Sequence, residues 1–144
     1  MKIKMRLSLL LCCFFVGSIL YSQSFQGEYR SNKTSFKDEI NPENSFIEET
    51  GFNILIVPKN EGKDGLIIIQ GPRIPKKAVI YSIVDFLGEM DEGNRKLHLF
   101  KVKSEHISEE ESIIVIYLNK EENLNLMVSN EESSQTFFNL KKLN

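Results

Sequence analysis

The chain has 144 residues, of which 41% are hydrophobic and 26% are charged, and its formal net charge is −2. This length and composition are typical of one globular domain and exclude a large two-domain architecture. Lys and Arg are not concentrated in any part of the chain, which excludes a nucleic-acid binder that works through a basic surface.

Residues 1–22 have the pattern of a secretory signal peptide. Three basic residues precede a short apolar core at 7–16, and small or polar residues follow it. The apolar core is too short for a secure membrane span, which needs about 20 apolar residues. We therefore expect cleavage near residue 22, export to the periplasm or the cell exterior, and no membrane span in the mature protein. An uncleaved N-terminal anchor is the alternative.

Removal of this segment changes the character of the chain. The segment holds both cysteines, three of the 18 basic residues and none of the 20 acidic ones, so the expected mature domain, 23–144, has a net charge of −5. Without cysteine the domain has neither disulfides nor cysteine-type metal sites, and its stability must come from a hydrophobic core. About 120 residues suffice, since such a chain buries about two-thirds of its surface.

The mature chain consists of short apolar runs separated by polar breaks. These runs are rich in Ile, Val, Phe and Tyr, which favour strands. They lie at 25–29, 34–40, 52–57, 65–70, 78–84, 96–103, 113–118, 124–128 and 136–140. We therefore expect a mainly β, single-domain fold: an antiparallel barrel or sandwich of about eight strands with one short helix.

Two segments bear on this fold class. Residues 41–51 begin with Asn-Pro-Glu and end with Gly, the start and stop signals of a short helix, with Phe46 and Ile47 as its apolar contact. Residues 78–87 fit both a strand and helical spacing, and their β-branched content favours the strand. An α+β fold, with helices on one face of an antiparallel sheet, is therefore the alternative.

Several runs do not alternate between apolar and polar residues. A strand with one wet face alternates, but 54–57, 66–69 and 113–118 are apolar throughout. We therefore expect both faces of the central sheet to be covered, either by the short helix and long loops or by a partner. The run at 96–103 carries three lysines instead, which is typical of an edge or solvent-facing strand.

The first strand after the leader, Phe25-Gln-Gly-Glu-Tyr29, resembles the Gly-x-aromatic opening strand of lipocalin-like, calycin-type barrels of secreted bacterial proteins. The family usually carries Trp there, and Tyr29 stands in its place. The resemblance implies an eight-stranded barrel that encloses a small apolar ligand, with the run at 136–143 pairing with the first strand. Its implied lining residues are Phe25, Tyr29, Phe52, Tyr81, Phe100, Tyr117 and Phe137 or Phe138.

Catalytic and metal-binding patterns are lacking in the sequence. The chain has no Gly-x-Ser-x-Gly motif, no phosphate-binding loop and no dinucleotide glycine pattern, and it has only two histidines, His98 and His106. Acidic residues beside His106 (Glu105 and 109–111) are interpreted as a solvated hairpin rather than a metal site. We therefore expect no catalytic residues, no metal site, no cofactor and no enzymatic activity.

Two functions remain. The first is an exported, non-enzymatic protein that binds a small apolar ligand in a lipocalin-like barrel. The second is an envelope or extracellular protein–protein interaction module, an accessory protein or inhibitor, that uses an apolar sheet face to bind a protein partner or a second copy of itself.

Overall fold

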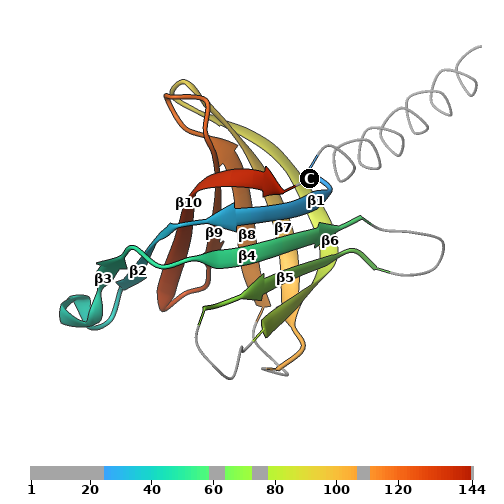
Figure 1. Ribbon diagram of the computed structural model, residues 1–144. Coiled ribbons are helices and arrows are strands. Elements are labelled where there is room, and N and C mark those ends of the chain that lie inside the picture. Colours follow the sequence, from blue (N-terminus) through green and yellow to red (C-terminus); the bar gives the residue numbers. More distant parts are fainter. Residues whose placement is uncertain (1–24, 59–63, 73–77, 107–110, 144) are drawn as a thin grey trace, which may run out of the picture.

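The computed structural model describes residues 25–58, 64–72, 78–106 and 111–143 (Figure 1). The predicted signal peptide, residues 1–22, lies outside these ranges. Within them the chain forms ten strands and one 3-10 turn. No helix among the described residues is long and apolar enough to cross a membrane.

The strands form one antiparallel sheet in the order β1-β4-β5-β6-β7-β8-β9-β10-β2-β3. Their bounds are β1 Gly27–Ser31, β2 Lys33–Asp38, β3 Phe46–Glu48, β4 Phe52–Val57, β5 Leu66–Gln70, β6 Ala78–Glu92, β7 Arg95–Ser104, β8 Glu111–Leu118, β9 Leu124–Ser129 and β10 Ser133–Leu143. Since β10 also pairs with β1, where Glu28 lies opposite Leu143, eight strands close into a barrel. This confirms the predicted β class and the pairing of the first and last strands. The chain adopts the barrel rather than the sandwich or the α+β sheet.

A hairpin extends from the barrel wall. Strands β1 and β2 are separated by Asn32 alone, and both pair with β10, β1 with its last residues and β2 with 133–138. Strand β3 then pairs with β2, so β2 and β3 project away from the barrel as a small ribbon (Figure 1). Closure removes sheet edges from the barrel itself and leaves β3 as an edge strand.

The short helix predicted over 41–51 is wrong. Only Pro42–Asn44 (η1) is helical, as a single 3-10 turn, and Asn41 makes no side-chain cap hydrogen bond. The ring of Phe46 in β3 stacks on that of Phe36 in β2, with 5.5 Å between the ring centroids. Helical segments this short are marginal in isolation, so the cross-strand aromatic pair favours the strand.

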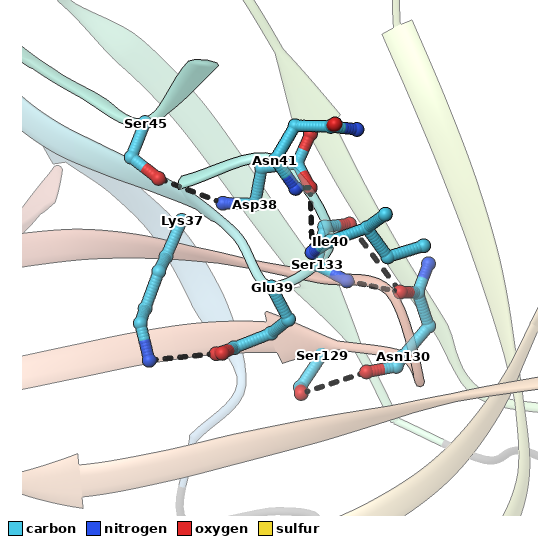
Figure 2. Close-up of polar contacts among 9 residues, drawn as sticks. All are labelled: Lys37, Asp38, Glu39, Ile40, Asn41, Ser45, Ser129, Asn130 and Ser133. Carbon is cyan, nitrogen blue, oxygen red and sulfur yellow. Dashed lines mark hydrogen bonds and ion pairs between the residues drawn. The ribbon is translucent and has the colours of Figure 1, made fainter. Parts of the chain in front are cut away.

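Figure 2 shows the polar contacts that form the turn in place of a helix. The Oδ1 atom of Asp38 accepts the N–H groups of Ile40 at 2.9 Å and Asn41 at 2.8 Å. The hydroxyl of Ser45 accepts the N–H of Asp38 at 3.0 Å. The hydrogen bond from the backbone of Asn41 is the main reason that the pKa of Asp38 is lowered. An Asp-centred turn therefore satisfies the amides of two residues that precede the 3-10 turn.

The ambiguous segment 78–87 is part of β6, which confirms the strand. Its register against β7 shifts twice, between Ile83 and Asp85 and between Phe86 and Gly88. Each β-bulge inserts one extra residue, so the side chains of β6 that pack against the core, Tyr81, Ile83 and Phe86, are unevenly spaced. Gly88 has φ 110°, a backbone conformation that residues with a Cβ atom rarely adopt.

The middle of the barrel is filled by side chains. Inward-facing residues of seven strands form one buried cluster, in which Ile54, Ile67, Val102, Ile114 and Leu126 are fully buried. A void bordered by this cluster measures about 10 Å³. That is room for at most about one water molecule.

The predicted cover on the second face is absent from the described part of the chain. The runs 54–57, 66–69 and 113–118 of β4, β5 and β8 are apolar throughout. Burial alternates along β4 and β5, whereas Ile114, Val115 and Ile116 of β8 are all buried. Outward-facing Leu55 and Ile113 are each 39% exposed. The 3-10 turn lies on the projecting hairpin instead (Figure 1), so the predicted helical cover is wrong. Cover by a partner stays a prediction.

Candidate ligand-binding site at one end of the barrel

One end of the barrel is hollowed between the β6–β7 turn, the β8–β9 turn and the segment that leads into β1. The cavity has a volume of about 550 Å³ and is partly open to solvent. Phe25, Leu118, Leu124 and the ring of Tyr117 form its apolar part. A concave, mainly apolar pocket of several hundred Å³ with a few polar groups has the features of a small-molecule site.

Phe25 separates this cavity from the filled interior. Its side chain lines both the cavity and the 10 Å³ void. The hydroxyl of Tyr29 donates a hydrogen bond to the carbonyl oxygen of Phe25 at 3.0 Å, which anchors the segment before β1. Burial raises the pKa of the Tyr29 phenol. This phenol therefore stays protonated and keeps its role as donor.

Three ionisable side chains gather beside the cavity. The second bulge in β6 places Glu89 opposite His98 of β7. The Oε1 atom of Glu89 lies 3.7 Å from Nδ1 of His98, and its Oε2 atom lies 3.4 Å from Nζ of Lys96. The side chain of His98 is 13% exposed, that of Glu89 25% and that of Lys96 56%. The acid therefore lies deeper than the ammonium group with which it pairs.

The imidazole of His98 is in a mixed apolar and charged environment. The ring of Phe25 contacts it edge-on, with 4.9 Å between the ring centroids. Burial lowers the pKa of His98 below its ordinary value of 6.5, Glu89 partly opposes this effect, and Lys96 adds to it. The ring is therefore mostly neutral at neutral pH, and it can gain a charge when its surroundings become more negative.

The rim of the cavity is built by the β8–β9 turn. The Oδ1 atom of Asn119 accepts the N–H groups of Glu121 at 2.9 Å and Asn123 at 3.0 Å. Glu122 has φ 61°, the left-handed conformation that this tight turn needs. These contacts fix the positions from which Lys120 and Glu122 face the cavity. The rim is thus preorganised rather than a loose loop.

A second hollow lies on the other side of the same two turns. It is wider and shallower, with a volume of about 760 Å³, and is bordered by Lys33, Arg95 and Phe138 among others. Lys33 lies over the ring of Phe138 at 5.8 Å, and Arg95 over the ring of Tyr117 at 5.3 Å. The ring of Phe138 in this hollow is therefore already covered by a cation of the chain, whereas Tyr117 lines the first cavity.

The predicted lining residues are divided between the core and the cavity. Phe25 and Tyr117 line the cavity. The core contains Tyr29, Phe100 and Phe137, and Phe52 and Tyr81 pack against it. These five side chains therefore fill the barrel and do not line the cavity. Phe138 borders the second hollow.

The charged part of the site was not expected from the sequence. The run at 96–103 was predicted to be an edge or solvent-facing strand, and its place inside the closed sheet, between β6 and β8, excludes the edge. Lys96, His98 and Phe100 follow one another at every second position, so they share one face of the strand. This alternation, in which Lys96 and His98 precede the apolar Phe100 on one face, was the signal in the sequence that Lys96 lies at the end of the barrel.

Among the described residues, no group of three or more His, Cys, Asp or Glu side chains could hold a metal ion. His106 is described, but Glu109 and Glu110 of its acidic neighbourhood lie outside the described ranges.

No protein-family model, curated protein or solved structure matches this chain. The site must therefore be interpreted from its own geometry and chemistry.

Proposed function

We propose that this protein is an exported, non-enzymatic binding protein that holds a small apolar ligand at the end of its barrel. The observation that carries the proposal is the contrast between the 10 Å³ void inside the barrel and the 550 Å³ cavity above Phe25. The apolar surfaces of Leu118 and Leu124 supply the driving force for an apolar ligand.

The lipocalin-like resemblance supports this proposal in a modified form. The eight-stranded closed barrel is the architecture that the resemblance implies. Since the interior is filled, the ligand would lie at the barrel mouth rather than deep inside. The signal-peptide pattern of residues 1–22 places this binding in the periplasm or outside the cell.

The test uses 1-octanol as a probe, with affinity measured by isothermal titration calorimetry on the mature protein. Leu118→Gln should weaken binding roughly tenfold, because it removes about 1.5 kcal/mol of apolar contact. Leu55→Gln is the matched control, since Leu118 and Leu55 are 50% and 39% exposed and Leu55 faces outward from β4. Absence of 1-octanol binding, or equal loss in both variants, would contradict the proposal.

The second candidate is self-association through the outer wall. Leu55, Ile68 and Ile80 lie side by side in the register of β4, β5 and β6 and form an apolar row on the outside. A second copy of the chain would cover this row in an isologous dimer. Light scattering across a concentration series tests it: Ile68→Lys should shift a dimer to a monomer, and a monomer at every concentration would exclude this candidate.

A further inference from the structure

We propose that the ligand of this cavity is an amphipathic anion and that His98 takes up a proton when the anionic group binds. This inference rests on the proposed function, because it assigns the polar end of the ligand to the same cavity whose apolar side holds the tail.

The first support is the arrangement of charges. Lys96, His98 and Lys120 all line the cavity, and each can carry a positive charge. An apolar tail on Leu118 and Leu124 would place the head of the ligand among these three groups. Two ammonium groups and one carboxylate, that of Glu122, line the cavity, so an anion would be attracted there more than a cation.

The second support is the position of Glu89 beside Lys96 and His98. Glu89 faces Lys96 at 3.4 Å and His98 at 3.7 Å from β6, and its side chain is only 25% exposed. Lys96 is more exposed and lines the cavity, whereas Glu89 is not among the lining residues, so an anion can reach the ammonium group of Lys96 from the cavity. Glu89 is thus the negative group that balances the charge of the empty site. A bound anionic ligand adds a second negative charge, which favours the protonated form of the His98 imidazole.

The protonation of His98 depends on all the charged groups around its imidazole. Glu89 faces it from β6, and Lys96 precedes it on β7. Lys120 and Glu122 line the same cavity from the turn after β8, together with the phenol of Tyr117. The segment before β1 contributes the uncharged ring of Phe25. An imidazole is the side chain whose ordinary pKa lies between about pH 5 and pH 8.

The sign of the coupling follows from linkage. In the empty site burial lowers the pKa of His98, so the ring is mostly neutral above about pH 6.5. A bound anion stabilises the imidazolium and raises this pKa, so binding takes up a proton. Affinity then increases as the pH falls between the two pKa values, by at most about tenfold per pH unit for one proton.

The experiment compares two probes with the same tail. Octane-1-sulfonate keeps its charge throughout the pH range, so any pH dependence belongs to the protein, and 1-octanol is the uncharged partner. Calorimetry at about pH 6 and about pH 8 should give sulfonate binding that is roughly fivefold or more tighter at the lower pH, with proton uptake. The affinity for 1-octanol should be independent of pH.

Variants assign the proton. His98→Gln should remove the pH dependence of sulfonate binding, whereas His106→Gln, which changes the other histidine of the chain, should leave it intact. Lys96→Gln, at an exposed position, should weaken sulfonate binding and leave 1-octanol binding unchanged. NMR titration of the His98 ring in the presence and absence of sulfonate should show its pKa rise on binding.

The outcomes separate this inference from the proposed function. Binding of 1-octanol without tighter sulfonate binding at low pH would overturn the inference and leave the apolar site standing. A pH dependence that survives in His98→Gln would also overturn it. Failure of both probes to bind would remove the proposed function and the inference together.

Discussion

The middle of the barrel and its hollowed end are built by the same strands, but side chains fill the middle and leave a cavity at the end. On the inward face of β7, Phe100 and Val102 are 3% and 0% exposed and belong to the core, whereas Lys96 and His98 line the cavity. The change occurs within two residues, where β7 leaves the filled cross-section. A filled barrel therefore still offers a binding site wherever its strands extend beyond the core.

The largest expected effect tests whether the middle serves stability alone. Ile114→Ala removes a fully buried side chain of β8 and should lower the free energy of unfolding by about 3 kcal/mol, through lost burial and the cavity left behind. Ile113→Ala changes the adjacent residue, which is 39% exposed, and should cost less than about 1 kcal/mol. Urea denaturation measures both, and similar losses would contradict the described inward and outward faces.

An intermediate effect is expected where the two regions meet. Phe25→Ala should lower the free energy of unfolding by about 2 kcal/mol, because the ring packs against the core without being fully buried. It should also join the cavity to the inner void, so that 1-decanol gains affinity relative to 1-octanol. Phe36→Ala, on the projecting hairpin, is the control and should leave the preference between the two alcohols unchanged. An unchanged preference in Phe25→Ala would show that this ring does not divide the two regions.

The smallest effect concerns the stability of the end itself. The pKa of His98 is lowered in the folded protein, so its contribution to stability is present above about pH 6.5 and lost as the pH falls through the folded-state pKa. The melting temperature of the unmodified protein should therefore fall more between about pH 7.5 and pH 5 than that of His98→Gln. His106→Gln should follow the unmodified protein. Parallel curves for all three proteins would mean that His98 is not effectively buried.

Much of the fold could be predicted because strand formation has a local signal. Runs of β-branched and aromatic residues marked most strands. The helix over 41–51 failed because cap and stop residues also fit a turn, and the choice depended on the pairing of Phe46 with Phe36 across two strands. That pairing is a tertiary contact, which local propensity does not contain.

The candidate site could be predicted only in part. Phe25 and Tyr117 were expected to line a ligand and do border the cavity. The position of Glu89 opposite His98 could not be predicted, because two bulges in β6 set the register of this strand against β7. A shift of one residue reverses the face of every side chain after it, so the position of a bulge controls the site.

The amino-acid sequence by itself determined the β class, the acidic charge of the chain after residue 22 and the reliance on a hydrophobic core, since these depend on composition and local pattern. The tertiary structure decided closure, because pairing between β1 and β10 joins residues more than 100 positions apart. Closure in turn filled the interior and left the cavity at one end. The meeting of Glu89, Lys96 and His98 is a consequence of register, which only the assembled barrel fixes.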